Sequence, residues 1–231
     1  MATHRPDPED LTARARIRDA ALLQFGEHGF ERATIRGIAE AAGVSSGLVR
    51  HHFGSKQALR EACDEYLARM LRRINDHIRA DVTLGEVNYL AATRASLGPY
   101  QRYLARAFVE GSAGTVFDEM VTMTEEWLAD IDAGRPDPPE VPRRARAAVV
   151  TAMALGVGVM HEHISRGLGV ELFTPEGDDL LARTLLDVYS HPLMRLDDAA
   201  KARAGLDRLR DASTQPQRGA TLRPVEEHQD A

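Results

Sequence analysis

The stretch from residue 34 to residue 56 decides the fold, and it reads Thr34-Ile-Arg-Gly-Ile-Ala-Glu-Ala-Ala-Gly-Val-Ser-Ser-Gly-Leu-Val-Arg-His-His-Phe-Gly-Ser-Lys56. Its first part carries apolar side chains at the spacing of one helix face, namely Ile35, Ile38, Ala39 and Ala42. Thr34 is a natural N-cap for this helix, and Gly43 is expected to end it because glycine adopts left-handed conformations readily. The stretch therefore begins with a short amphipathic helix that closes on a tight turn.

A second short helix is predicted directly after this turn. Ser45 can cap its N-terminus, Val44 and Val49 can pack together across the cap, and Phe53-Gly54 marks its end. Its outward face then carries polar or small residues: Ser46, Gly47, Arg50 and His51. Two short helices joined by a glycine-containing turn are typical of a helix-turn-helix, whose second helix enters the major groove of DNA. We therefore expect double-stranded DNA as a partner.

The distribution of charge favours this hypothesis locally, although the whole chain carries a net charge of −6. Between residues 32 and 56, the carboxylate of Glu40 stands among several basic residues: Arg32, Arg36, Arg50 and Lys56. Helix N-termini also attract phosphates, which makes Thr34 and Ser55-Lys56 candidates for contacts with the DNA backbone. The same basic residues would also fit a solvated face, and Thr34 and Ser55 could serve as helix caps alone, so both interpretations stay open at this point.

The remainder of the chain also predicts helices. Its apolar spacing is helical nearly throughout, and no sustained alternation of period two calls for a sheet. The predicted helices span residues 12–27, 55–79, 99–111, 115–132, 143–166, 175–190 and 197–211. Gly29 is expected to stop the first of them, and the proline-rich segment 134–142 is a clear break. The sequence therefore predicts an all-α fold.

The ends and the cysteine content suggest where the chain works. Residues 1–10 and 211–231 are polar and are expected to be disordered. The single cysteine, Cys63, cannot form an internal disulfide, and the first residues lack the order of a secretory signal. The longest nearly apolar stretch, 147–160, is shorter than the roughly 18 residues of a membrane span. We expect a cytoplasmic protein with no membrane partner.

The pattern from Thr34 to Leu59 resembles the DNA-binding segment of the TetR family of transcriptional regulators, and the resemblance extends over residues 14–67. It implies a DNA-binding transcriptional regulator, expected to be a repressor and not an enzyme. The residues at family positions that touch or lie close to DNA are Thr34, Arg36, Ser45, Ser46, Gly47, Arg50, His51 and Lys56. The family commonly has an aromatic residue, usually tyrosine, where this chain has Arg50 and His52. One of these two must replace the tyrosine contact with phosphate, or the contact is lost.

The resemblance also implies an architecture. It is an all-α fold in which an N-terminal three-helix DNA-binding head, containing the helix-turn-helix, is joined by a long fourth helix to an all-helical ligand-binding and dimerisation body. The head would span residues 11–55 and the body residues 56–210, between the disordered tails 1–10 and 211–231. A ligand that prefers one spacing of the two heads would change the affinity for the operator, with the fourth helix as the lever.

The predicted helices 143–166 and 175–190 resemble the pair that forms the family's dimer interface. The first of them is apolar on several faces and contains alanines and glycines that would let helices approach closely. Candidate interface residues are Met153, Val157, Met160, His161, Leu181, Leu185 and Val188. Burial inside one subunit would explain the same pattern. A two-fold homodimer would place its recognition helices roughly 34–36 Å apart, or a multiple of this, and predicts a pseudo-palindromic operator.

The middle helices supply candidates for the effector pocket that the family carries in its body. They are Tyr66, Met70, Tyr100, Tyr103, Leu104, Phe108, Phe117, Met120, Met123 and Trp127. Such a set implies a small apolar effector with a few hydroxyl contacts. The same residues at helical spacing would also form ordinary core. A DNA-binding regulator without a small-molecule effector is therefore the main alternative.

Two other motifs in the sequence could indicate an enzyme or a metal site. Gly43-Val-Ser-Ser-Gly47 matches the nucleophile elbow of serine hydrolases, but the residues before it form a helix where the elbow needs a strand, so a serine hydrolase is a remote alternative. His161-Glu-His163 places its two histidines on different sides of a helix, so they cannot grip one metal ion. No cofactor, metal or catalytic residue is expected.

Overall fold

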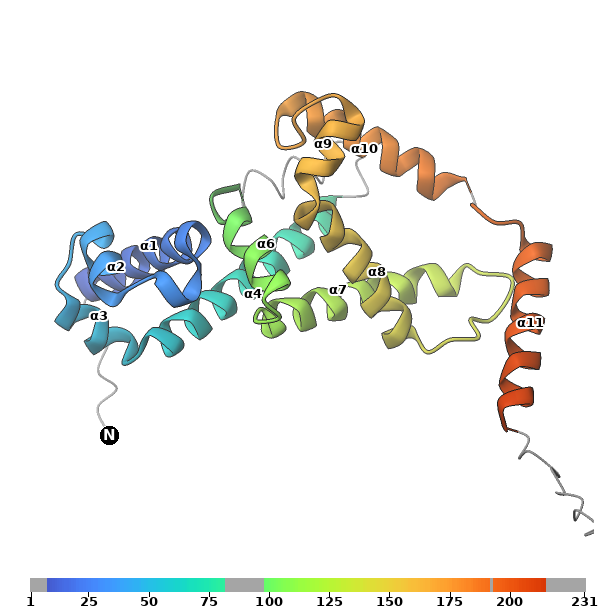
Figure 1. Cartoon of the computed structure of the whole chain (residues 1–231), viewed down its shortest axis with the longest axis horizontal. Helices are drawn as coiled ribbons and strands as arrows, with labels where there is room; N and C mark the ends of the chain where they lie inside the picture. Colours follow the sequence, from blue (N-terminus) through green and yellow to red (C-terminus); the bar gives the residue numbers. More distant parts are fainter. Residues whose placement is uncertain (1–7, 82–97, 192, 215–231) are drawn as a thin grey trace, which may run out of the picture. The chain divides into compact units, whose positions relative to one another are not determined.

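The computed structural model describes residues 8–81, 98–191 and 193–214, and all regular structure in these ranges is helical (Figure 1). The elements are α1 (Pro8–Arg32), α2 (Ile35–Ala42), α3 (Ser46–Phe53), α4 (Lys56–Asp81), the 3-10 turn η2 (Gly98–Tyr100), α6 (Gln101–Val109), α7 (Gly114–Ala133), α8 (Arg143–Val159), α9 (His161–Leu168), α10 (Pro175–Ser190) and α11 (Leu196–Thr214). The predicted all-α fold is confirmed.

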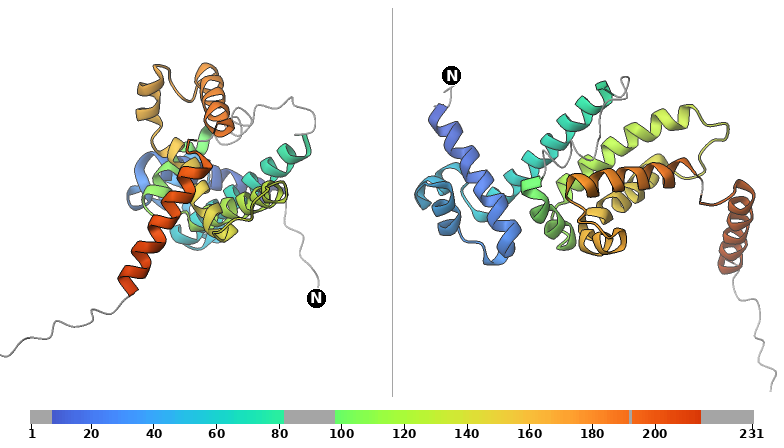
Figure 2. Two further views of the ribbon diagram at one scale, coloured as in Figure 1. Left: turned by 90° about the vertical axis from the view of Figure 1, so that its right-hand side faces the viewer. Right: turned by 90° about the horizontal axis from the view of Figure 1, so that it is seen from above.

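The chain divides into two compact units within α10. The first runs to Ala182 and contains α1 to α9, and the second begins at Arg183 and contains the end of α10 together with α11. In the first unit, α1, α2 and α3 gather beside the N-terminal part of α4, and α7 and α8 run side by side (Figure 2). The first unit thus holds both the helix-turn-helix and most of the predicted body.

Several helix ends differ from the sequence-based boundaries. Helix α1 begins at Pro8 and continues to Arg32, although Gly29, with φ 79° and ψ 161°, interrupts its regular helical backbone where a stop was expected. Residues 8–10 and 211–214, which were assigned to disordered tails, lie in α1 and α11. The rest of the predicted tails, 1–7 and 215–231, lies outside the described residues.

The single helix predicted over residues 143–166 is wrong. The chain breaks at Met160 into α8 and α9, which meet at a bend of 72°. Gly156 and Gly158 come shortly before the break, and glycine lowers the intrinsic stability of a helix by about 1 kcal/mol relative to alanine. Among the described residues, no single helix is long and apolar enough to cross a membrane, and this bent pair reaches the required length and composition only when its two helices are taken together.

One apolar core connects the helix-turn-helix to the helices behind it. Its buried members come from α1, α2, α3, α4, α6 and α7, and they include Ile17, Leu22, Phe25, Ile38, Val49, Phe53, Leu59, Leu67, Tyr103 and Val116. Helix α1 packs against α2, α3, α4 and α6, so its buried face is shared by both ends of this core. The position of the helix-turn-helix is therefore coupled to α4 and α6 through packed side chains.

Ion pairs fasten α7 to its two neighbours. On one side, Arg72 of α4 pairs with Glu119 at 2.5 Å and with Glu126 at 2.7 Å. On the other side, the Arg146 guanidinium of α8 donates two hydrogen bonds to the Asp132 carboxylate of α7, at 2.9 and 2.6 Å. The hydrogen bonds from Arg146, with those from Arg143, lower the pKa of Asp132 to about 2. Asp132 thus stays charged and keeps the start of α8 against the end of α7.

The closest approach between α1 and α6 occurs at Gly26. A Cβ atom at this position would lie 2.9 Å from the backbone nitrogen of Tyr103 and 3.3 Å from its Cα atom. Because these are backbone atoms, a larger residue would push the whole of α6 away from α1. Gly26 is therefore what allows the two helices to pack backbone against backbone.

We expect Gly26→Ala to lower the free energy of unfolding by about 1–3 kcal/mol, because the added methyl group overpacks this contact. Gly167→Ala is the matched control, since Gly167 is also helical and a Cβ there would meet nothing within 4 Å. That control should be neutral or should stabilise by up to about 1 kcal/mol. Urea unfolding of both variants checks the prediction. Equal stability of Gly26→Ala and wild type would show that α6 can shift at little cost.

Candidate nucleic-acid interface

The turn between α2 and α3 is built as the sequence predicted. The Thr34 hydroxyl accepts a hydrogen bond from the Gly37 N–H at 3.0 Å and caps α2. At the other end, Gly43 adopts φ 67°, and its N–H donates to the Glu40 carbonyl, while the Val44 N–H donates to the Ala39 carbonyl. This pair of hydrogen bonds is a Schellman motif, which satisfies the last carbonyls of α2 and sets the direction of α3.

Helix α3 shows one buried face and one exposed face. The Ser45 hydroxyl caps it by accepting from the Leu48 N–H at 3.1 Å. Val49 and Phe53 are buried in the core, and Arg50 and His51 are exposed. Gly47 is exposed too, and a Cβ there would meet only the Ser45 hydroxyl, at 3.7 Å. The predicted outward face is thus exposed, with Ser46 half-buried at its start.

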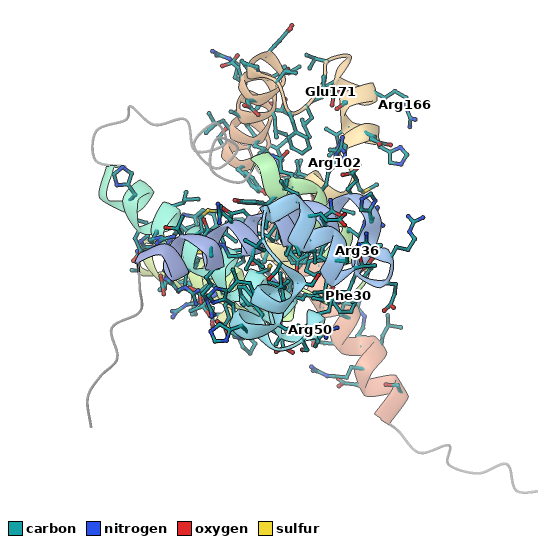
Figure 3. All side chains as sticks on the ribbon, turned by 90° about the vertical axis from the view of Figure 1, so that its left-hand side faces the viewer. Phe30, Arg36, Arg50, Arg102, Arg166 and Glu171 are labelled. Carbon is teal, nitrogen blue, oxygen red and sulfur yellow. The ribbon has the colours of Figure 1, made fainter. Side chains whose placement is uncertain are left out.

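Two arginines of the helix-turn-helix differ in their partners. Arg36 of α2 pairs with Glu40 at 2.9 Å, although the side chains of both residues are largely exposed. The side chain of Arg50 in α3 forms no hydrogen bond or ion pair with any residue in the described ranges. Figure 3, which looks onto the α1–α3 end of the first unit, shows both side chains there. The Arg50 guanidinium can therefore donate all its hydrogen bonds to DNA.

Lys56 is placed differently from what a phosphate contact requires. Its Nζ atom donates to the carbonyl oxygens of Phe30, Glu31 and Ala33, at 2.8, 3.2 and 3.1 Å. It also lies 4.5 Å from the centroid of the Phe30 ring. An ammonium group has three N–H donors, so these carbonyls use all of them. In this structure Lys56 joins the start of α4 to the end of α1.

Two further residues near the interface act within the protein. Arg14 of α1 donates to the His52 carbonyl at 3.0 Å and lies 4.7 Å from the centroid of the Phe53 ring, so it secures the end of α3. Sequence reasoning missed it, because nothing in the local pattern marks a partner so distant in the chain. The His52 side chain is half-buried, and its Nε2 atom is buried without a hydrogen-bond partner among the described residues.

The residues predicted to line an effector pocket occupy three environments. Tyr103 is buried and donates a short hydrogen bond to Asp64, and burial raises the pKa of both groups. Tyr66, Met70, Tyr100, Leu104, Phe108, Met120 and Met123 are half-buried against the main core, and Phe117 packs against a second cluster between α7 and α8. Trp127 is 50% exposed. The structure therefore brings most of this set to one core, with Trp127 at the surface.

The predicted dimer residues are divided between the two units. On α8 and directly after it, Met153 and Met160 are exposed, and Val157 and His161 are half-buried. In the first half of α10, Leu181 is only 8% exposed. In the second unit, Leu185 is half-buried and Val188 is exposed. Sequence reasoning did not single out Val149, which is also exposed and lies one turn before Met153.

Two short helices, a capped glycine turn and an exposed second helix define a helix-turn-helix DNA-binding protein. Residues 17–63 match the family model described as bacterial regulatory proteins, tetR family. The HTH-type transcriptional regulatory protein RaaS of Mycobacterium tuberculosis is 43% identical over 148 residues, which cover 62% of this chain and 68% of that protein. The chain belongs to the TetR family and is a DNA-binding transcriptional regulator.

Other similarities agree with this assignment. The HTH-type transcriptional repressor AcnR of Corynebacterium efficiens is 38% identical over 76 residues, covering 32% of this chain and 40% of that protein. Among solved structures, the fatty acid degradation regulator FadR from Bacillus halodurans superposes with a TM-score of 0.56 at 17% identity, covering 81% of this chain and 100% of that chain. An ArpA-like gamma-butyrolactone receptor superposes with a TM-score of 0.53 at 20% identity, covering 88% and 99%. At these identities the structural similarity concerns the fold.

We expect Lys56→Gln to lower stability and Arg50→Gln to leave it nearly unchanged. Lys56→Gln should lower the free energy of unfolding by about 1–3 kcal/mol, because it leaves three carbonyls without their charged donor. Arg50→Gln removes an exposed side chain without an internal partner. It should change the free energy of unfolding by less than about 0.5 kcal/mol. Thermal or urea unfolding of the two variants checks this. An unchanged stability of Lys56→Gln would contradict the internal role of Lys56.

Proposed function

We propose that this regulator represses transcription as a homodimer that binds a pseudo-palindromic DNA operator, and that a small apolar effector in its body releases it. The observation that carries the proposal is the exposed face of α3, where Arg50 is free of internal partners. The DNA contacts would be made by Thr34, Arg36, Ser45, Ser46, Gly47, Arg50 and His51. Lys56 would join them by exchanging its three carbonyl partners for a phosphate. We infer that it acts in the cytoplasm, where its DNA lies.

The proposal assigns DNA binding and ligand binding to two consecutive parts of the chain. Residues 11–55 would form the DNA-binding head, and residues 56–210 the ligand-binding and dimerisation body. Repression is supported by the name of the relative AcnR, a transcriptional repressor that is 38% identical over 76 residues. Within the head, Thr34 and Ser45 already cap α2 and α3, and the free N–H groups at these helix ends could still donate hydrogen bonds to a phosphate.

Dimerisation is supported by an apolar stripe on α8. Val149 and Met153 are exposed and lie four residues apart on one side of α8, and the exposed Met160 follows directly after the helix ends at Val159. Exposed side chains of this size on a single helix face mark a surface that another protein covers. A second copy of the chain would bury the stripe and present two copies of α3 to one operator.

The alternative without an effector is favoured by one observation. Tyr103, one of the ten predicted lining residues, borders a pocket of about 10 Å³ between α1, α4 and α6, a volume that suits roughly one water molecule. A screen of apolar compounds for release of the DNA complex separates the two hypotheses. Release by a compound that also raises the melting temperature supports an effector, and its loss with Phe108→Trp places the effector in the body.

We expect Arg50→Ala to weaken binding to the operator by about tenfold or more, because one base or phosphate contact is worth about 1–3 kcal/mol. If Arg50 contacts phosphate, the dependence of log affinity on log salt should also flatten by about one. Mobility shifts with DNA selected from genomic fragments, at several salt concentrations, measure both effects. Arg102→Ala, which removes an exposed arginine from α6, is the control. Equal losses in the two variants would contradict a specific role for Arg50.

We expect Met153→Glu to convert the dimer to monomers, because it places a charge within the apolar stripe of α8. Val109→Glu is the control, since Val109 on α6 is 72% exposed, compared with 62% for Met153. Sedimentation velocity at several protein concentrations gives the oligomeric state of each variant. If Met153→Glu still forms dimers, the proposal that α8 forms the interface is contradicted.

A further inference from the structure

A surface hollow of about 490 Å³ lies beside the end of α1. Its lining comes from three helices and includes Arg32 of α1, Arg60 of α4 and Arg106 of α6. Phe30 and Ser112 contribute a ring and a hydroxyl, and the same two residues border the small pocket that reaches inward to Tyr103. The lining of the large hollow includes none of the residues predicted to hold an effector, although Arg60, Arg106 and Glu110 also border the small pocket beside Tyr103.

None of the three arginines in this hollow forms an ion pair with a described carboxylate, although the charge of Arg60 interacts with that of Asp64. Arg32 Nε donates to the His28 carbonyl at 3.1 Å, and the guanidinium carbon of Arg60 lies 4.6 Å from the centroid of the Phe30 ring. Neither these two nor Arg106 forms an ion pair with any residue in the described ranges. By contrast, Arg72 and Arg146 in the same unit each pair with a carboxylate.

Two carboxylates border the hollow, but they do not engage its arginines. Glu31 and Glu110 line it, and both are exposed. Neither is engaged in an ion pair or hydrogen bond through its side chain with the described residues, so the three guanidiniums retain their charge and donors. His28 is also exposed at the rim and would add positive charge when protonated. The convergent groups of the hollow are therefore mainly cationic donors.

We propose that this hollow is a binding site for a small polyanion that carries phosphate or carboxylate groups. Guanidinium groups present two parallel N–H donors that match such oxygens, and several of them around one hollow can hold more than one charge. Arg32, Arg60 and Arg106 supply the charge. The Ser112 hydroxyl borders the site, and Phe30 provides an apolar wall for the carbon skeleton of the anion.

At this location a bound anion would connect three helices. Its three arginines come from α1, α4 and α6, and Lys56 already ties the Phe30 carbonyl to the start of α4. An anion bound by all three would join α6 to the helices that carry the helix-turn-helix. It would thereby favour the arrangement of α6 in which Arg106 reaches the hollow. The effect on DNA binding rests on the proposed function, whereas the binding of the anion does not.

Isothermal titration calorimetry on the full chain without DNA tests the site, with inorganic pyrophosphate and citrate as separate probes. We expect saturable binding of one anion per chain, weakened about tenfold or more by Arg106→Gln, because a charged hydrogen-bonded contact is lost. Arg102→Gln, which removes the same charge from the same helix outside the hollow, should leave the affinity unchanged. Saturation by only one probe would assign the site to phosphates or to carboxylates.

The proposal is overturned if neither probe binds saturably below about 10 mM. It is also overturned if Arg102→Gln weakens binding as much as Arg106→Gln, or if Arg50→Gln alone abolishes it, since the anion would then bind elsewhere. Arg60→Gln is the second variant should Arg106→Gln fail to fold, as judged by its melting curve without ligand. Binding of the probe without any change in operator affinity would keep the site and overturn its coupling to DNA binding. Failure to find an operator would affect only the proposed function.

Discussion

Helix α1 buries one face, with Ile17, Leu22 and Phe25 almost fully shielded from solvent, against helices from both ends of the first unit. The same core contains Val49 of α3 and Tyr103 of α6. Close-packed side chains transmit displacement because they leave little space for one helix to move alone. Helix α3 and the helices behind it therefore share a single packed interior, and the remaining contacts of this unit are arranged around it.

The contacts that surround this core are polar and specific. The buried carboxyl of Asp64 accepts from the Tyr103 hydroxyl, and Arg18 of α1 lies 3.4 Å from the centroid of the Tyr66 ring while it pairs with Asp19. A buried polar group is costly without its partner, so separating α4 from α6 would have to break or replace the first of these contacts. Packing at Gly26 and this hydrogen bond thus resist the same movement.

The sequence predicted the local features of the helix-turn-helix because their signals are local. Thr34 and Ser45 form hydrogen bonds three residues away, and Gly43 adopts the left-handed conformation that glycine favours. The partners of Lys56 lie 23 to 26 residues away in the chain, so no pattern around it could reveal them. The break at Met160 was missed because apolar spacing continues across it. Packing and long-range hydrogen bonds decided these positions, and the roles of the site residues in DNA binding remain predictions.

The basic residues of the helix-turn-helix differ in how readily they could leave their partners. The pair between Arg36 and Glu40 is exposed, and such pairs contribute only about 0–1 kcal/mol, so a phosphate can replace Glu40 at little cost. Lys56 would have to abandon three carbonyls, and Arg14 would uncover Phe53. Some of the basic residues near α3 are available for DNA, whereas others stabilise the fold, and the composition alone cannot distinguish the two groups. Arg50 and Arg36 can be used for DNA at small internal cost, whereas Lys56 and Arg14 maintain the shape that presents them.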